Sequence, residues 1–157
     1  MSRLRTALSG CGKIGRTHAA ALRKLDESEF VAVCDVSGDR AEAFGKDFGV
    51  PGYADVIRML DQAKPDAVLI ATPHPLHAEP AVLAASRGAH VLVEKPLASN
   101  LHDCDRMIEA AANVGTRLGI ISQRRYLEPV RRMKGAIDDG KIGRPMLGVF
   151  LMYSWRD

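Results

Sequence analysis

The feature that constrains this chain most is a glycine-rich hexapeptide, Gly10-Cys11-Gly12-Lys13-Ile14-Gly15, which separates an apolar run from a segment with helical periodicity. Three glycines at this spacing between a strand and a helix are typical of a turn that binds a dinucleotide. Gly10 permits the tight turn, Gly12 lets a pyrophosphate approach the backbone, and Gly15 lets the helix pack closely on the strand. The N–H groups that begin the helix then attract the phosphates. The alternative interpretation is a glycine turn that serves packing alone.

Short apolar runs alternate with helical segments along most of the chain. The runs are rich in Val, Ile and Leu and are continuous, which is typical of strands buried on both faces. We therefore predict an α/β fold with a doubly wound parallel sheet that helices cover on both faces. The predicted strands are Leu4–Ser9, Phe30–Cys34, Ala67–Ala71, His90–Glu94 and Arg117–Ser122.

Amphipathic segments lie between the predicted strands. One follows Asn100, an expected N-cap with Asp103 three residues later, and keeps its apolar side chains at helical spacing. Another has Pro80 in its first turn and ends before Gly88, a residue suited to the position after a helix. We predict helices directly after the glycine-rich turn and over Gly38–Phe48, Val56–Leu60, His77–Arg87 and Leu101–Ala112.

The alternation of apolar runs and helical segments ends after the last predicted strand. A basic segment, Arg124–Asp139, is expected to form a helix that begins near Glu128. Met146–Trp155 alternates loosely and is predicted to be one long strand. It has no partner strand in the sequence, and a lone edge strand favours aggregation. We divide the chain into a first domain over residues 1–122 and the start of a second over residues 123–157.

The charges of the chain are nearly balanced, with 22 basic and 19 acidic residues and a net charge of +3. This small excess gives no indication of nucleic-acid binding. The excess is concentrated between Arg124 and Arg144, where a solvated helix face is the simpler interpretation and an acidic partner is the alternative.

The three cysteines, Cys11, Cys34 and Cys104, are too widely spaced for a disulfide framework or a metal pair, so we expect no metal. The N-terminus runs directly into a strand with no apolar signal segment. No apolar run approaches the roughly 20 residues that cross a bilayer. We therefore expect a cytoplasmic protein with no membrane partner.

Asp35 lies 20 residues after Gly15, directly after the second predicted strand. An acidic residue there binds the adenosine ribose hydroxyls of a dinucleotide, and its charge repels a ribose 2′-phosphate. This position favours NAD. Ser37 and Arg40 follow closely and could reach a 2′-phosphate, so NADP stays open. An exposed helix position is the simpler interpretation of Arg40.

Two further segments follow predicted strands at the edge where open α/β sheets bind their ligands. Ala71-Thr72-Pro73 leads to His77. Three roles are open for this histidine: it caps the next helix, it contacts a cofactor, or it has a purely structural role. Glu94-Lys95-Pro96 ends a strand, because Pro96 disfavours helical geometry at Lys95. A lysine in this crevice can hydrogen-bond a substrate hydroxyl and stabilise a developing alkoxide. A salt bridge at the strand end is the alternative.

In this order and at this spacing the motifs resemble the glucose–fructose oxidoreductase, inositol dehydrogenase and MocA family. The resemblance covers essentially the whole chain. It implies an NAD(P)-dependent oxidoreductase acting on CH–OH groups of a sugar, sugar derivative or cyclitol. It also implies an N-terminal Rossmann domain, a C-terminal α+β domain and a homo-oligomer for the complete protein. The resemblance rests on the glycine-rich turn, Ala71-Thr72-Pro73 with His77, His90-Val91-Leu92-Val93-Glu94-Lys95-Pro96 and Arg124-Arg125-Tyr126.

The resemblance also implies roles for individual residues. Lys95 would be the catalytic lysine beside the nicotinamide and the substrate. Lys13 and Ile14 would meet the pyrophosphate. The remaining cofactor pocket would be lined by Thr72, Pro73, His77, Glu94 and Gln123. The substrate would also be contacted by Arg124, Arg125 and Tyr126.

Members of the family are much longer than this chain, and an Asp and a His on a helix of their second domain supply acid–base chemistry. That segment would lie beyond Asp157, so only the first elements of a truncated α+β domain are expected here. We expect the chain of 157 residues to bind NAD(H) and to turn over weakly or not at all. The alternative function is an NAD(H)-binding regulatory or sensing module without catalysis.

Overall fold

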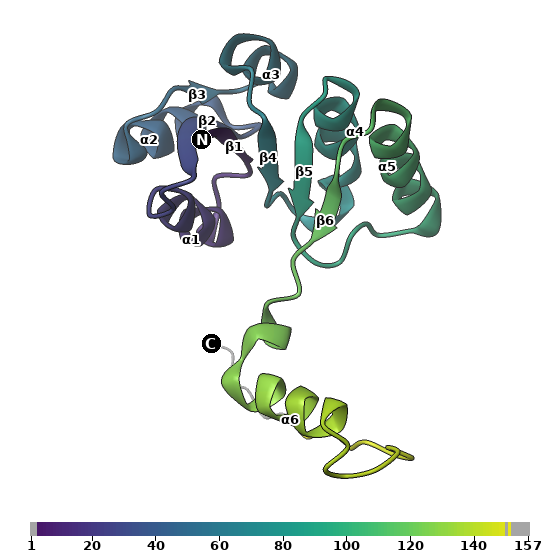
Figure 1. Ribbon diagram of the computed structural model, residues 1–157. Coiled ribbons are helices and arrows are strands. Elements are labelled where there is room, and N and C mark those ends of the chain that lie inside the picture. Colours follow the sequence, from purple (N-terminus) through teal and green to yellow (C-terminus); the bar gives the residue numbers. More distant parts are fainter. Residues whose placement is uncertain (1–2, 150, 152–157) are drawn as a thin grey trace. The chain divides into compact units, whose positions relative to one another are not determined.

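A computed structural model describes residues 3–149 and 151 of the chain. The chain divides into two compact units, one ending at Ile121 and the other beginning at Ser122. The first unit is an α/β domain in which helices pack on a parallel sheet (Figure 1). The predicted fold class is therefore confirmed for this unit.

The sheet of the first unit has six strands in the order β3-β2-β1-β4-β5-β6, all of them parallel. The predicted runs all form strands, with ends that differ by one or two residues. β3 was not predicted, because two residues are too short to show any periodicity. The strands are β1 (Leu4–Ser9), β2 (Ser28–Cys34), β3 (Gly52–Tyr53), β4 (Ala67–Ile70), β5 (His90–Val93) and β6 (Leu118–Ile120).

The strand order reverses at β1, which pairs with β2 on one side and with β4 on the other. Such a switch point opens a crevice beyond the carboxyl ends of the two strands, and α/β sheets bind ligands there. The register aligns the strand ends at this edge. One row of paired residues contains Ser9, Cys34, Ile70, Val93 and Ile120. The residues that follow them therefore meet along a single edge of the sheet.

The helices of the first unit begin and end close to the predicted residues. Asn100 accepts a hydrogen bond from the Asp103 N–H at 2.8 Å, so the predicted N-cap is confirmed. Gly88 has a φ of +84°, as expected after a helix. The helices are α1 (Lys13–Leu22), α2 (Gly38–Phe48), α3 (Val56–Ala63), η1 (His74–Leu76, a 3₁₀ turn), α4 (Ala78–Ser86) and α5 (Leu101–Val114).

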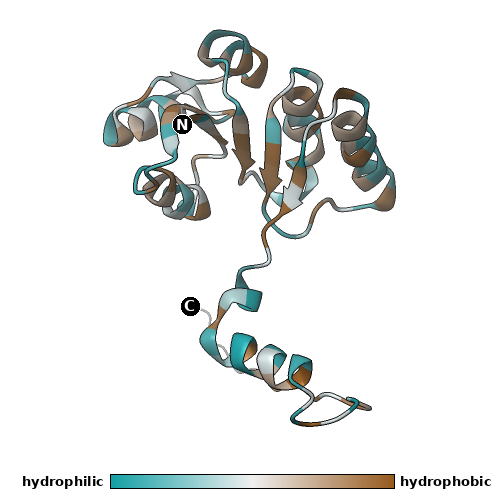
Figure 2. Ribbon diagram, in the orientation of Figure 1, coloured by the Kyte–Doolittle hydropathy of each residue, from teal (hydrophilic) through white to brown (hydrophobic). Residues whose placement is uncertain are grey.

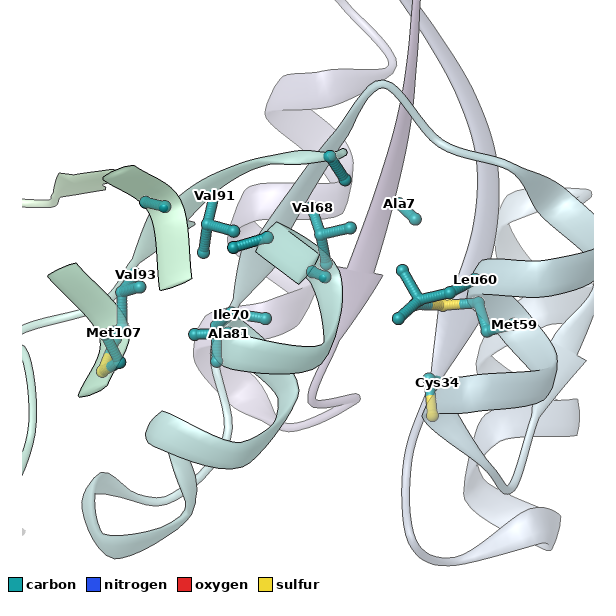
Figure 3. Packing of buried hydrophobic residues seen from close by; sticks show 14 of the residues in the cluster. Ala7, Cys34, Met59, Leu60, Val68, Ile70, Ala81, Val91, Val93 and Met107 are labelled. Atoms are coloured by element: carbon teal, nitrogen blue, oxygen red, sulfur yellow. The ribbon is translucent and has the colours of Figure 1, made fainter. Parts of the chain in front are cut away.

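Hydrophobic residues are concentrated in the central strands (Figure 2), and the buried ones form two clusters on the two faces of the sheet. One layer packs against α3, α4 and α5 and includes Val68, Val93 and Met107 (Figure 3). The other packs against α1 and α2 and includes Leu8 and Phe44.

Helices cover both faces of the sheet as predicted, but the prediction that the strands are buried on both faces does not hold for β5 within the described residues. Val91 and Val93 are buried in the layer under α4 and α5. Leu92 points to the opposite face and is 42% exposed. A continuous apolar run predicts that both faces of a strand are buried, but it does not show which segment covers each face.

The second unit contains η2 (Gln123–Tyr126), a 3₁₀ turn, and α6 (Glu128–Asp138). The predicted helix is present from Glu128 onward, with Pro129 in its first turn. Charged side chains on α6 pair along its exposed surface, Arg132 with Glu128 and Lys134 with Asp138. These pairs support the interpretation of the basic run as a solvated face.

The predicted strand Met146–Trp155 is not present in the described residues. Residues 146–149 and 151 form no regular secondary structure, and the rest of the predicted strand lies outside the described residues. A strand needs a ladder partner to satisfy its backbone groups. That this unit begins an α+β domain stays a prediction.

Candidate cofactor site

The glycine-rich turn joins β1 to α1 at the switch point, and two of its glycines are required by close contacts. Gly10 has a φ of +106°, and a Cβ atom there would lie 2.5 Å from the Ala71 carbonyl carbon. A Cβ atom on Gly15 would lie 2.0 Å from the Gly10 carbonyl oxygen. No larger residue fits either position without moving the backbone. The tight turn and the close approach of the helix are thus both present.

Gly12 differs from the other two glycines because a Cβ atom there would meet no protein atom within 4 Å. It is the N-cap of α1, which has no side-chain cap and no acidic residue in its first turn. Lys13 and Ile14 follow as exposed residues. The start of α1 therefore combines uncapped N–H groups, a positive dipole end and open space. This arrangement fits the pyrophosphate of a dinucleotide.

Asp35 follows β2 and ties the end of this strand to the glycine-rich turn. Its side chain is only 7% exposed. Oδ2 accepts a hydrogen bond from the Cys11 N–H at 3.0 Å, and Oδ1 accepts one from the Ser37 N–H at 3.0 Å. A carboxylate held by backbone donors beside the turn is well placed for ribose hydroxyls.

Ser37 and Arg40 have local structural roles next to Asp35. The Ser37 hydroxyl caps α2 by accepting the Arg40 N–H at 3.3 Å. The Arg40 guanidinium donates to Asp35, with an Nη1–Oδ1 distance of 3.1 Å, and its side chain is 58% exposed. Arg40 thus occupies the exposed helix position expected of it, and its ion pair with Asp35 places a cation beside that carboxylate.

Cys11 and Cys34 are buried thiols at the base of the turn. The Cys11 Sγ donates to the Cys34 carbonyl oxygen at 3.6 Å. Burial, with a contribution from the Asp35 charge, raises the pKa of Cys11 to about 12. Burial also raises the pKa of Cys34 to about 11. Both thiols are therefore protonated and weakly nucleophilic at neutral pH.

Iodoacetamide at pH 8 should label Cys104 before Cys11 and Cys34. With a pKa near 12, about one Cys11 thiol in ten thousand is ionised at this pH, whereas Cys104 is only partly buried. We expect labelling of Cys11 to be at least about 100-fold slower than labelling of Cys104, measured by peptide mass spectrometry. Chain unfolded in urea is the control and should be labelled at all three cysteines. Equal rates in the folded chain would contradict the buried placement of Cys11.

Thr72 and Pro73 follow β4 at the other side of the switch point. The Thr72 hydroxyl donates to the Leu76 carbonyl oxygen at 3.0 Å, and Pro73 precedes the first residue of η1. The backbone N of Thr72 lies 2.7 Å from where a Gly10 Cβ would stand. The two loops of the crevice are therefore in direct backbone contact.

His77 is fully buried and bridges two of these loops. Its Nδ1 lies 2.9 Å from the Pro96 carbonyl oxygen and its Nε2 lies 2.9 Å from the Thr72 carbonyl oxygen. A neutral imidazole has one N–H and donates to one carbonyl at a time, whereas the charged ring donates to both. His77 makes no side-chain cap bond to α4. Of the three interpretations, the geometry favours the structural one.

Replacing His77 with leucine should destabilise the first unit by about 2 kcal/mol or more, because it removes the donor to buried carbonyl groups and weakens the link between the loops. His77→Gln keeps a donor and should lose less. We would measure urea unfolding by circular dichroism. The matched control is His102→Leu on the exposed surface of α5, which should leave the midpoint unchanged. An unchanged midpoint for His77→Leu would contradict the bridging role.

Glu94 and Lys95 follow β5 along the same edge. Glu94 is buried, and its Oε2 accepts the Lys95 N–H at 3.1 Å. Lys95 is exposed, and the Lys95–Pro96 peptide bond is cis. Within residues 3–149 and 151 no carboxylate forms an ion pair with the Lys95 ammonium. Among these residues, the alternative of a salt bridge made by Lys95 at the strand end is therefore not supported.

Sequence reasoning missed His18, which the fold brings to this group. His18 lies on α1, and its Nε2 is 2.8 Å from Glu94 Oε1. The only local signal is its position three residues after Gly15, on the helix that opens at the turn. The pairing itself joins residues that are 76 apart in sequence.

Four candidate residues lie in the second unit and are not placed against this site. All four are exposed on η2. That they contact cofactor or substrate stays a prediction. These residues are Gln123, Arg124, Arg125 and Tyr126.

A family described as an oxidoreductase family with an NAD-binding Rossmann fold matches residues 4–122. The chain belongs to this Gfo/Idh/MocA family. The match covers the first unit, including the glycine-rich turn, Asp35 after β2 and the segment that contains Lys95. The first unit is therefore an NAD-binding Rossmann domain, as the sequence predicted.

Relatives in the family are dehydrogenases of sugars and inositols. The D-apiose dehydrogenase of Paraburkholderia graminis is 36% identical over 149 residues, which are 94% of this chain and 40% of that protein. The WlbA dehydrogenase of Bordetella pertussis, solved with NADH and UDP-GlcNAcA, superposes with a TM-score of 0.85 at 34% identity, covering 90% of this chain and 44% of that one.

A third relative has a cyclitol in its structure. The scyllo-inositol dehydrogenase of Lactobacillus casei, solved with NAD(H) and scyllo-inositol, has a TM-score of 0.83 at 26% identity, covering 90% of this chain and 43% of that one. The chain thus spans somewhat under half the length of the relatives it matches.

In the part of the chain that the structure describes, no helix has the length and apolar character needed to cross a bilayer. Across residues 3–149 and 151, no group of three His, Cys, Asp or Glu side chains is arranged to hold a metal ion.

Proposed function

We propose that this chain supplies the cofactor site and the catalytic lysine of a dehydrogenase acting on a CH–OH group of a sugar, sugar derivative or cyclitol. The observation that carries the proposal is the placement of Lys95. It follows β5 at the edge where the NAD-binding turn lies, with its N–H held by Glu94 and its side chain exposed. The substrates named for the three relatives support this class of alcohol.

The residues of the first unit divide the work of binding and chemistry. NAD, when bound, supplies the hydride acceptor. Gly12 and the start of α1 would hold the pyrophosphate, and Asp35 would accept hydrogen bonds from the adenosine ribose. The Lys95 ammonium would donate a hydrogen bond to the substrate oxygen and stabilise the negative charge that develops there as the hydroxyl proton is removed. Thr72 and Pro73 would line the pocket, and His77 would hold the Thr72 and Pro96 loops together through its hydrogen bonds.

We propose that the proton acceptor comes from sequence that relatives carry beyond the region matched here. General acid–base catalysis typically contributes ~10²–10⁴-fold, so the chain alone should bind NAD(H) but turn over weakly. We further propose that Gln123 contacts the cofactor and that Arg124, Arg125 and Tyr126 contact the substrate. A homo-oligomeric state and a cytoplasmic location for the complete protein stay predictions.

A chimera tests the role of Lys95. Residues 1–122 would replace the matching part of the Paraburkholderia D-apiose dehydrogenase, and NAD reduction by D-apiose would be followed at 340 nm. Lys95→Ala should lower kcat at least ~10²-fold while NADH binding changes by less than about threefold, because the ammonium acts on the substrate. Lys95→Arg is the matched variant that keeps the charge.

Each outcome of this experiment has a meaning. Turnover of the Lys95→Ala chimera at the rate of the unsubstituted chimera would overturn the proposed role of the lysine. Binding of NADH without turnover in a folded, unsubstituted chimera would favour the alternative function of an NAD(H)-binding module.

A further inference from the structure

The carboxylate of Glu94 is shared between a helix and the backbone of the lysine. Oε1 lies 2.8 Å from His18 Nε2, and Oε2 accepts the Lys95 N–H at 3.1 Å. The side chains of His18 and Glu94 are 17% and 9% exposed, respectively. Water therefore has little access to this pair, and each oxygen of the carboxylate has a specific donor.

The lysine segment is held on its other side as well. The Pro96 carbonyl oxygen lies 2.9 Å from His77 Nδ1, on the loop that follows β4. Lys95 thus lies between two residues whose polar groups are fixed by histidines. The two histidines come from different elements, since His18 is on α1 and His77 precedes α4.

His18 connects this segment to the phosphate end of the site. It lies on α1, six residues after Gly12, whose open face fits a pyrophosphate. The α1 helix is short and has regular hydrogen bonding from its first turn, with the Arg16 N–H bonded to the Gly12 carbonyl oxygen at 3.0 Å. A rigid helix therefore leads from the turn to the carboxylate that accepts the Lys95 N–H.

We propose that His18 is a positioning residue for Lys95, acting through Glu94. The His18 ring donates through Nε2 to Glu94, which orients the carboxylate so that its second oxygen accepts the Lys95 N–H. The helix that faces the phosphates is thereby linked to the lysine. This proposal rests on the proposed function only where it calls Lys95 catalytic.

The physical reason lies in the demands of a buried carboxylate. An ionised carboxylate only accepts hydrogen bonds, and a buried acceptor without a donor is unfavourable. Removing the imidazole leaves Oε1 unpaired, so Glu94 gains by rotating toward water. That rotation withdraws Oε2 from the Lys95 N–H. A glutamine at position 18 still offers an N–H₂ donor and should hold the carboxylate in place.

The test measures the Lys95 amide in the ¹⁵N-labelled chain by NMR, without cofactor. In His18→Leu we expect this amide to exchange with solvent at least about fivefold faster and to lose the downfield shift of an N–H bonded to a carboxylate. His18→Gln should restore both readouts to near the unsubstituted values. His102→Leu, the same substitution on the exposed face of α5, should change neither.

Core amides of β4 report whether each variant is folded, and Glu94→Ala provides a second way to remove the link. A folded His18→Leu or Glu94→Ala chain with an unchanged Lys95 amide would overturn the proposal. So would a His18→Gln chain that behaves like His18→Leu. Should His18→Leu not fold, His18→Ala, which removes the same donor without adding an apolar side chain, decides the matter by the same two readouts. A parallel NADH titration of the unsubstituted chain tests the proposed function, because the exchange result does not depend on the cofactor.

Discussion

Gly15→Ala is expected to abolish measurable NADH binding and to lower the free energy of unfolding by about 3 kcal/mol or more. The added methyl group would stand 2.0 Å from the Gly10 carbonyl oxygen, a distance that no contact can keep. Both partners are backbone, so no flexible side chain can yield. The helix must therefore move away from the turn, and the phosphate-binding geometry moves with it. Nucleotide fluorescence measures the binding and urea unfolding measures the stability.

Gly12→Ala is the matched variant that separates binding from folding. Its methyl group would meet no protein atom within 4 Å, and its backbone, with φ near −85°, suits alanine. The cost in stability should stay near or below about 1 kcal/mol, the usual difference between glycine and alanine at an N-cap. NADH binding should nevertheless weaken at least about tenfold, because the methyl group fills the space that faces the pyrophosphate.

Either of two results with these variants would contradict the account. A Gly12→Ala chain that binds NADH as tightly as the unsubstituted chain would show that the cofactor does not approach this glycine. A Gly15→Ala chain with unchanged stability would show that the helix is not packed on the turn as described.

Asp35→Ala is expected to weaken NADH binding about 10- to 100-fold and to reverse or remove the preference for NADH over NADPH. The substitution removes the acceptor for the ribose hydroxyls and the negative charge that repels a 2′-phosphate. It also frees the Arg40 guanidinium, which pairs with Asp35 at 3.1 Å. A cation released at the ribose position should attract the 2′-phosphate of NADPH.

The double variant Asp35→Ala with Arg40→Gln isolates the contribution of the arginine. Compared with Asp35→Ala alone, the double variant should bind NADPH more weakly and NADH equally weakly, as measured by titration with both nucleotides. Arg40→Gln alone should change NADH binding by less than about threefold, since the side chain is largely exposed. An Asp35→Ala chain that still prefers NADH as strongly as before would contradict the assignment of Asp35 to the ribose.

The sheet was predictable because its strands carry their own local signal. Runs such as Leu4–Ser9 are apolar and continuous, and α2 has its cap, Ser37, directly before it. β3 was not predictable, because Gly52–Tyr53 is too short to have a period and exists only through its pairing with β2. The exposure of Leu92 was missed for a related reason, since coverage of a strand depends on segments elsewhere in the chain.

The candidate site shows the same division between local and distant information. The roles of Gly10 and Gly15 follow from the spacing of the three glycines between a strand and a helix, which is a local pattern. The contact of Arg40 with Asp35 joins residues that are five apart in sequence and was not predicted. The pairing of His18 with Glu94 and the bridge made by His77 join separate loops. Nothing at either residue's own position in the sequence encodes its partner.

The measurement that tests the central claim most directly is a titration of the purified chain with NADH and with NADPH, read by the fluorescence of the nucleotide. The account predicts saturable binding that favours NADH and that Gly12→Ala weakens without unfolding the chain. The absence of NADH binding by a chain whose β4 amides are protected from exchange would contradict the claim that this chain carries the cofactor site.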